Sequence, residues 1–286
     1  MSWHQIKALL VNTYNEWNAV DAPRMGAALA YYTVLSLAPL LIVVIAVAGL
    51  VFGEQAAQGA LVTQIRGLVG QQGAEAIQGI LKNAGGQKSA GLIASIVGFL
   101  ALLFGASSVA LELRSAMNKI WKVKEEGGGI STFIKQRSYA FALVLGAGFL
   151  LLVSLVVSAV LAGVGKFFDG LIPFPAWIAE VVNVIISLIA IAGILAAIFK
   201  LLPAVSITWK DVAIGAIFTS VLFTAGKTLI GIYLGRASVG STYGAAGSLV
   251  VVLVWIYYSA QILFFGAEFT RVYSQEYGSQ PDRLAK

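Results

Sequence analysis

Six apolar runs, each 21 to 26 residues long, make up about half of this sequence. At 1.5 Å per residue, each run is long enough to cross the roughly 30 Å hydrocarbon core of a bilayer as a helix. Hydrocarbon offers no hydrogen-bond partners, so a spanning segment has to satisfy its own backbone groups. The sequence therefore predicts one all-α, polytopic membrane domain over residues 1–286, with six transmembrane helices at 27–52, 91–111, 139–163, 178–202, 212–234 and 246–270.

The composition excludes several kinds of protein. Hydrophobic residues make up 59% of the chain and charged residues 11%, against about 25% charged residues in soluble domains. Cysteine is absent and the only histidine is His4, which excludes thiolate and histidine-cluster metal sites and cysteine nucleophiles. We expect no metal, no cofactor and no enzymatic activity.

The positive charges predict how the helices are oriented. The termini, the second connection and the fourth connection together hold 13 Lys and Arg residues, and the opposite connections hold 5. Because short cytoplasmic loops are enriched in Lys and Arg, both termini are predicted to be cytoplasmic. Most of the net charge of +6 thus lies in short loops, and no nucleic-acid partner is expected. The first apolar run exceeds the 7 to 15 residues of a signal-peptide core, so no cleaved signal is expected.

Two connections and the tail have features of their own. The outer loop 53–90 is predicted to contain short amphipathic helices over the bundle, because apolar residues recur there at near-helical spacing. It is either an ordered cap or a surface for a partner. The stretch 271–286 is predicted to be a short cytoplasmic tail. The basic cytoplasmic loop 112–137 begins with an interfacial helix, whose basic face either binds lipid headgroups or serves only to set the topology. Its headgroup candidates are Arg114, Lys119 and Lys122.

A charge interrupts the fifth apolar run. Ser220, Thr224, Lys227 and Gly231 are spaced so that they share one helix face. A cation at membrane depth costs roughly 2.5 to 3.5 kcal/mol on insertion scales, so it usually faces a cavity or a partner. Lys227 is interpreted as a cavity charge, as half of a buried ion pair with Glu180, or as a cation that reaches outward to the interface.

The sixth and first runs also carry polar residues. One face of the sixth run holds Trp255, Tyr258, Gln261, Phe265 and Glu268. Glu268 is interpreted either as the partner of Arg271, three residues on, or as a proton- or cation-binding carboxylate at the inner mouth. In the first run, Tyr32 and Ser36 lie near Pro39, which frees a backbone carbonyl and kinks the helix.

Four segments resemble the BrkB/YihY family of bacterial inner-membrane proteins, also called virulence factor BrkB and once labelled ribonuclease BN. The first three are AALAYYTVLSLAPLL at 27–41, LRSAMNKIWKV at 113–123 and LPAVSITW at 202–209. The fourth, YLGRASVGSTYGAAGSLVVVLVWIYYSAQILFFGAEFTRVY at 233–273, is the most specific. The resemblance implies six helices with cytoplasmic termini in the bacterial inner membrane and a transport-like function. Ribonuclease activity finds no support, because RNA cleavage needs a metal cluster or an acid and base pair facing water.

The leading hypothesis is a carrier or exporter of a small solute, ion or lipid, with a polar cavity between the helices. The cavity candidates are Tyr32, Ser36, Thr224, Lys227, Tyr243, Tyr258 and Gln261. The ion-pair or coupling candidates are Glu180, Lys227 and Glu268. The alternative is a scaffold or lipid-handling protein that recruits envelope proteins through the outer loop. Membrane lipids are expected partners in both cases, and a homo-oligomer is compatible with either.

The postulated pair of Lys227 and Glu180 leads to a first prediction. If the two side chains pair, the losses of stability caused by Lys227→Ala and Glu180→Ala are not additive, because each substitution already removes the interaction. A double-mutant cycle of unfolding free energies in detergent measures this coupling. Additive losses would show that the two residues are not paired.

Overall fold

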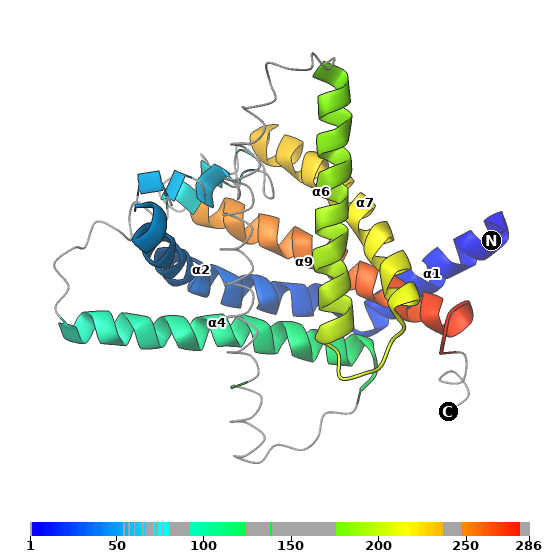
Figure 1. Ribbon diagram of the computed structural model, residues 1–286. Coiled ribbons are helices and arrows are strands. Elements are labelled where there is room, and N and C mark those ends of the chain that lie inside the picture. Colours follow the sequence, from blue (N-terminus) through cyan, green and yellow to red (C-terminus); the bar gives the residue numbers. More distant parts are fainter. Residues whose placement is uncertain are drawn as a thin grey trace.

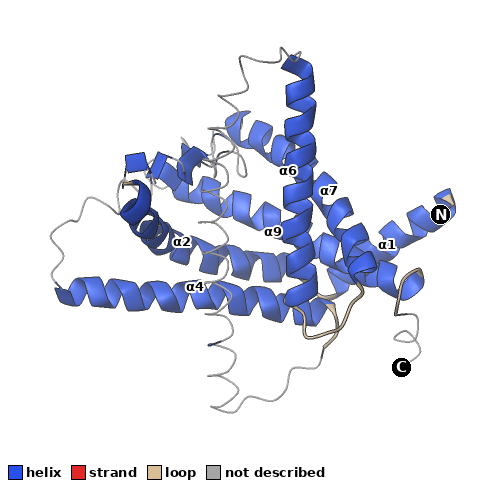
Figure 2. Ribbon diagram, viewed as in Figure 1, coloured by secondary structure: helices blue, strands red, loops and turns tan. Residues whose placement is uncertain are grey.

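The computed structural model describes residues 2–53, 92–123, 138, 176–236 and 247–280, together with scattered positions between 55 and 79. This part of the chain is helical and contains no strand (Figure 2). Its named helices are α1 (Trp3–Ala19), α2 (Ala22–Phe52), α4 (Leu92–Ile120), α6 (Ala176–Leu201), α7 (Trp209–Arg236) and α9 (Gly247–Glu276). Figure 1 shows α2, α4 and α9 running side by side, with α1 in contact with the end of α9.

Five of the six predicted runs fall in these helices with at most one residue outside, and the third, 139–163, lies outside the described residues. Two stretches of the described residues, Trp209–Leu234 and Leu249–Glu276, are long and apolar enough to cross a membrane. All-helical architecture is therefore observed for the described part of the chain. Six membrane crossings stay a prediction.

The helices extend beyond the apolar runs that predicted them. The second run was expected to end at residue 111 with a further helix extending from it, and α4 is one helix to Ile120. The sixth was expected to end at residue 270, before a tail, but α9 continues through Arg271 to Glu276. A prediction from hydropathy ends a helix at the residue where charged side chains begin. Here the charged residues stay helical because other helices supply their partners.

The N-terminal helix α1 was not predicted. It begins with a capping box, in which the Ser2 side chain accepts a hydrogen bond from the Gln5 backbone N–H and the Gln5 side chain accepts one from the Ser2 N–H. It ends at a tight turn in which Asp21 takes a left-handed conformation, with a φ of 60°, and Pro23 lies in the first turn of α2. After this turn the chain changes from α1, which contacts mainly α9, to α2.

Two reciprocal contacts hold α7 and α9 together. A Cβ added at Gly215 would lie 1.9 Å from Thr270 Oγ1, and one added at Gly266 would lie 2.0 Å from Thr219 Oγ1. Each helix therefore contributes a glycine four residues before a threonine, and each threonine lies over the glycine of the other helix. The pairing of an early α7 residue with a late α9 residue makes the two helices antiparallel. Small residues at such positions let helix backbones approach closely.

The threonine hydroxyls in this contact need no further partner. Thr219 donates to the Gly215 carbonyl at 2.6 Å, and Thr270 donates to the Gly266 carbonyl at 2.7 Å. Each hydroxyl hydrogen is thus bonded within its own helix. The methyl group and the oxygen atom of each threonine pack against the other helix. The contact is polar in composition but behaves as a close-packed apolar one.

The buried side chains form two main clusters at different levels of the bundle. The first joins the ends of α4 and α6 to the beginnings of α2 and α7, and includes Met117, Ile120, Phe199 and Phe264. The second includes Leu61 and Ile77 of the outer loop together with residues of α2, α7 and α9. The described residues of that loop from 55 to 79 are helical. These described loop residues therefore pack onto α2, α7 and α9.

The α7 and α9 contact leads to a second prediction. Gly266→Ala places a methyl group against Thr219, forces the helices apart and is expected to cost about 1–3 kcal/mol of unfolding free energy. Gly231→Ala is the matched control, because a Cβ at Gly231 meets no atom within 4 Å and alanine favours a helix by up to about 1 kcal/mol. Unfolding in mixed detergent micelles measures both. Equal stability of the two variants would contradict the close approach of α7 and α9.

Candidate functional site along α9

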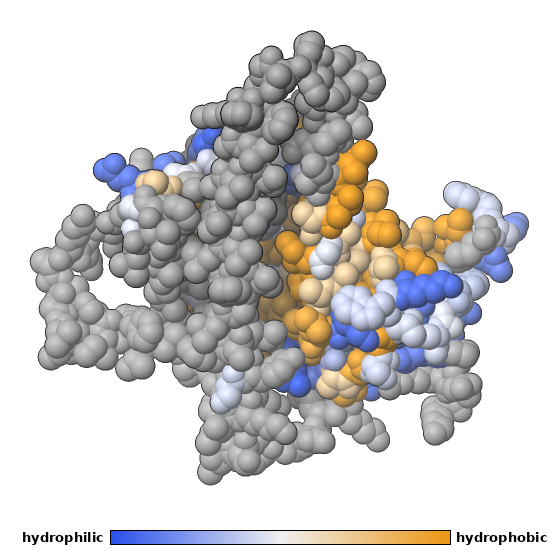
Figure 3. Space-filling model, in the orientation of Figure 1, coloured by the Kyte–Doolittle hydropathy of each residue, from blue (hydrophilic) through white to orange (hydrophobic). Residues whose placement is uncertain are grey.

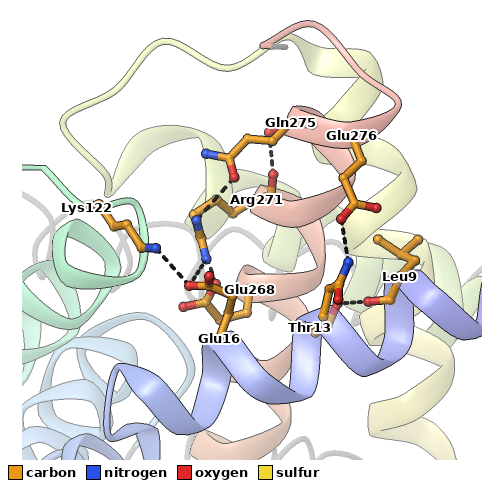
Figure 4. Close-up of polar contacts among 10 residues, drawn as sticks. Leu9, Thr13, Glu16, Lys122, Glu268, Arg271, Gln275 and Glu276 are labelled. Atoms are coloured by element: carbon orange, nitrogen blue, oxygen red, sulfur yellow. Dashed lines mark hydrogen bonds and ion pairs between the residues drawn. The ribbon is translucent and has the colours of Figure 1, made fainter. Parts of the chain in front are cut away.

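A buried arginine joins α1, α4 and α9 (Figure 4). The Arg271 side chain is 2% exposed, and its Nε donates to Glu268 Oε2 at 2.8 Å. Its Nη2 donates to Glu16 Oε2 at 2.6 Å, and its Nη1 donates to Gln275 Oε1 at 3.2 Å. Lys122 Nζ reaches the same Glu16 oxygen at 2.9 Å. We call these four charged residues, Glu16, Lys122, Glu268 and Arg271, the inner charge network.

The network combines buried and exposed charges. Glu268 has a side chain that is 0% exposed, whereas Glu16 is 34% and Lys122 is 59% exposed. When all four side chains are ionised, the two acids and the two bases carry no net charge. Each buried charge then has an opposite charge nearby, which a buried charge requires. The Arg271 and Glu268 pair is one of the two interpretations that the sequence left open. Partners from α1 and from the end of α4 were not expected.

Glu268 has one oxygen left over. Its Oε2 accepts from Arg271, but its Oε1 is buried and has no hydrogen-bond partner within the described part of the chain. A buried acceptor without a donor costs roughly 1–3 kcal/mol. Such a group in a folded protein calls for an explanation, such as a bound proton, ion or water.

Lys122 reaches Glu16 from an unusual backbone position. It follows α4 with a φ of 52°, in the left-handed region that glycine favours. The Val123 N–H bonds to the Asn118 carbonyl and the Lys122 N–H bonds to the Lys119 carbonyl, as in a Schellman helix end. Glycine would fit this backbone with less strain, but it could not supply the ammonium group that Glu16 contacts.

The environment of Glu16 changes its acidity. Burial by itself raises the pKa of this carboxyl, but the hydrogen bond from Lys122 and the charges of Arg271 and Lys122 outweigh burial and hold the pKa below its ordinary value of 4.5. A lowered pKa in the folded state means that the ionised form stabilises the fold. This contribution is present above the pKa of the unfolded chain and is lost as the pH falls through the lower, folded pKa.

A second buried polar group lies two turns before Glu268. Gln261 faces α2, where a Cβ added at Gly26 would lie 2.0 Å from its Nε2 atom. Both Nε2 and Oε1 of Gln261 are buried and have no partner among the described residues. Seven residues correspond to nearly two full helical turns, so Gln261 and Glu268 share a face of α9, roughly 10 Å apart along its axis. The glycine opposite gives the amide room but no hydrogen bond.

The predicted stripe on the sixth run is divided between two neighbours. Trp255 packs edge-on against Phe223 of α7 with ring centroids 6.3 Å apart, and Phe265 lies 6.3 Å from Phe218. The Tyr258 hydroxyl lies 3.0 Å from a Cβ built at Gly226 of α7. Gln261 and Glu268 instead face α2 and α1. The structure therefore separates residues that the helical spacing had grouped together.

Several cavity candidates satisfy their hydroxyls locally. Ser36 is buried on α2 and donates to the carbonyls of Tyr32 and Thr33, at 2.9 and 3.1 Å. Thr224 donates to the Ser220 carbonyl at 2.8 Å. The Tyr32 side chain is 38% exposed. A role for these residues in lining a cavity stays a prediction.

Three candidates cannot be placed fully. Lys227 is partly buried on α7 and is engaged in an interaction within the chain. Glu180 belongs to α6, but its side chain is outside the described part. Tyr243 lies outside the described residues. The pairing of Lys227 with Glu180 stays a prediction.

The basic residues after the second run have a different setting from the one expected. Met117, Ile120 and Trp121 lie among these basic residues in the sequence and are buried in the main protein core. Lys119 is exposed, Lys122 contacts Glu16, and Arg114 is partly buried and engaged within the chain. Binding of lipid headgroups by these residues stays a prediction.

Sequence reasoning missed Glu16, although a signal was present. Ile6, Leu9, Tyr14, Trp17 and Val20 recur at spacings of three to five, behind a Ser2 and Gln5 capping pair. This pattern indicates a helix with one apolar side. It does not show that Glu16 meets a residue 255 positions away in the chain.

Comparison with known proteins agrees with the membrane assignment. The family model described as virulence factor BrkB matches residues 13–286. A UPF0761 membrane protein of Psychrobacter sp. (strain PRwf-1) is 29% identical over 87% of this chain and 45% of its own length. Similar proteins of Pseudomonas aeruginosa (strain LESB58) and Verminephrobacter eiseniae (strain EF01-2) are 27% and 30% identical, over 86% of this chain and 58% and 57% of theirs. The chain thus spans about half the length of these curated relatives. No solved structure matches it.

The inner charge network leads to a third prediction. Arg271→Gln leaves Glu268 buried without a counter-charge and is expected to cost about 3–5 kcal/mol of unfolding free energy. Lys122→Gln removes the exposed cation from the same Glu16 oxygen and is expected to cost at most about 1 kcal/mol. Unfolding in mixed micelles at pH 7 compares the two variants.

A pH series serves as the control. Glu16→Gln is expected to be less stable than the natural protein at pH 7, and this difference shrinks as the pH falls from 4.5 through the lower pKa of the folded chain, because Glu16 is protonated in both folded and unfolded chains only below both pKa values. Equal losses for Arg271→Gln and Lys122→Gln would contradict the argument from burial. A difference that does not change with pH would contradict the role given to Glu16.

Proposed function

Because this chain belongs to the virulence factor BrkB family and is a membrane protein, we propose that it is a transporter or exporter of a small solute, ion or lipid. The observation that supports this function is the pair of unsatisfied polar side chains, Gln261 and Glu268, on one face of α9. The proposed path follows that face, along which α2 and α1 are the neighbouring helices.

Buried polar side chains without hydrogen-bond partners lower the stability of a membrane protein. Gln261 has two donor hydrogens and an acceptor oxygen buried without partners, and Glu268 has one free oxygen. Polar and ionisable side chains within membrane helices are expensive and usually mark a substrate or ion path. A solute or cation passing along α9 would meet the amide first and the carboxylate two turns later.

The hydrogen bonds of the other polar residues in the described helices favour a path along α9 alone. Ser36, Thr219, Thr224 and Thr270 all donate to carbonyls of their own helices, so their hydroxyl hydrogens are already used. Among the described residues of α9, unsatisfied polar atoms occur at Trp255, Gln261 and Glu268. The proposed path is therefore carried by α9 rather than by the hydroxyl stripe of α7.

A scaffold function is less favoured by the described part of the outer loop. Leu61 and Ile77 are 5% and 6% exposed and pack within the second cluster. A loop that recruits a partner has to present apolar surface outward. These two residues are instead used to cover the helices.

Cysteine accessibility tests the proposed path, and the natural absence of cysteine makes the experiment simple. Gln261→Cys is expected to react with a membrane-impermeant thiol reagent in vesicles, because water has to reach a transport path. Ala267→Cys is the matched control, since Ala267 is 0% exposed and lies in the protein core on the same helix, between Gln261 and Glu268. We expect labelling at 261 to exceed labelling at 267 by at least tenfold.

Two outcomes would contradict the proposal. Resistance of residue 261 to every aqueous thiol reagent would show that no water-accessible path reaches α9 at this level. Equal labelling at 261 and 267 would show general opening of the bundle rather than a defined path.

A further inference from the structure

Helix α1 has an exposed apolar stripe that the rest of the described protein does not cover. Trp3, Ile6, Leu10 and Tyr14 follow one another at spacings of three and four, so they share one face of the helix. Their exposed fractions are 76%, 39%, 37% and 57%. A row of four large apolar side chains facing outward requires a partner or an apolar solvent.

The other sides of α1 have different surroundings. Leu9 and Thr13 are buried, and Leu9 packs in a cluster with Phe269 and Val272 of α9. The far side carries exposed small and polar residues, including Ala8 and Asn15. One side of the helix thus faces the protein, one side is suited to water, and the stripe lies between them.

The contacts of α1 with α9 determine how deep α1 lies in the membrane. Asn12 Nδ2 donates to Glu276 Oε1 at 2.8 Å, and Glu16 accepts from Arg271, so α1 runs beside the last two turns of α9. Those turns end the apolar stretch Leu249–Glu276. The end of a membrane-crossing helix lies at the boundary between hydrocarbon and water, and α1 is attached there.

Exposed aromatic residues mark the same level on neighbouring elements. Because α7 and α9 are antiparallel, Trp209 at the start of α7 lies at the end of the bundle where α9 finishes. Trp209 is 62% exposed and Tyr277, just after α9, is 38% exposed. Tyr233, 57% exposed near the far end of α7, lies about 36 Å away from Trp209 at 1.5 Å per residue. This separation fits two interfacial belts of Trp and Tyr on either side of the hydrocarbon.

Between these belts the surface is apolar. Ile217, Val221, Leu229 and Ile232 of α7 are all about half exposed or more, and Figure 3 shows a continuous apolar patch on the face where α7 lies. Leu9 of α1 belongs to a buried cluster against which Ile214 and Phe218 of α7 pack, so α1 lies beside one end of this surface. Its surroundings are therefore those of a lipid boundary.

We propose that α1 lies in the plane of the membrane, at the interface where α9 ends, with Trp3, Ile6, Leu10 and Tyr14 inserted between lipid headgroups and acyl chains. With 17 residues it is about 25 Å long and too polar to cross the membrane. An amphipathic helix of this kind is held by its apolar face. Lys7 is its only Lys or Arg, and its one acid, Glu16, is bound to Arg271. Anionic headgroups are therefore not needed to hold it.

Spin labelling of the full chain in lipid vesicles tests this placement. Labels on Leu10→Cys and Ala8→Cys report collisions with oxygen, which concentrates in lipid, and with a water-soluble nickel chelate. In vesicles of phosphatidylcholine, the ratio of oxygen to nickel accessibility is expected to be at least fivefold higher at residue 10 than at residue 8. Ala8 is a close control because it is exposed on the same helix but away from the stripe.

Three results would overturn the proposal. Equal nickel access at residues 8 and 10 would place the stripe in water. Protection of residue 10 from both reagents would show that protein, such as a second copy of the chain, covers it. Lipid access at residue 10 that appears only when phosphatidylglycerol is added would show that charge holds the helix. Since none of these results depends on solute movement, the proposal stands or falls separately from transport.

Discussion

Burial of the Arg271 guanidinium is the constraint on which the described inner end of the structure depends. A guanidinium that is 2% exposed has to be met by acceptors, because an unpaired buried charge costs several kcal/mol. Glu268 and Gln275 come from the same helix, but Glu16 comes from α1 and brings Lys122 with it from the end of α4. The charge therefore explains why α9 remains helical beyond its apolar run and why α1 turns back. The same network explains why a lysine, Lys122, adopts a left-handed backbone conformation after α4, since its ammonium group contacts Glu16.

The polar residues of the helices fall into two groups with different consequences. The hydroxyls of Ser36, Thr219 and Thr270 bond to carbonyls one turn earlier, so they allow close packing and leave nothing unsatisfied. Gln261 and Glu268 have buried atoms without partners in the described part of the chain. In a medium that offers no hydrogen bonds, this difference separates residues that pack helices from residues that are available to a solute. Polar character in a membrane helix is thus a weak sign of function until the hydrogen bonds have been assigned.

The proposed path and the proposed interfacial helix meet at the inner charge network. Glu268 closes one end of the polar face of α9, and Glu16 holds Arg271 from a helix whose outer side is apolar. In the proposed placement, the same short helix therefore sets both the depth of α1 in the lipid and the pairing of Arg271. Packing of Leu9 against Phe269 and Val272 and ion pairing of Glu16 with Arg271 both hold the end of α9, which has low apolar content.

The sequence by itself determined the helical class and the positions of five apolar helices, because backbone hydrogen bonding and the thickness of hydrocarbon leave few alternatives to a long apolar helix. It also identified Glu268 as a residue with two interpretations, one of them a pair with Arg271, which the structure contains. It did not identify Glu16 or Lys122 as partners, since contacts between residues 255 positions apart leave no local pattern. Only the tertiary structure divided the stripe of the sixth run between α7 and α2. Which neighbour a side chain meets is decided by how whole helices cross, and the close Gly and Thr contacts of α7 with α9 set that crossing.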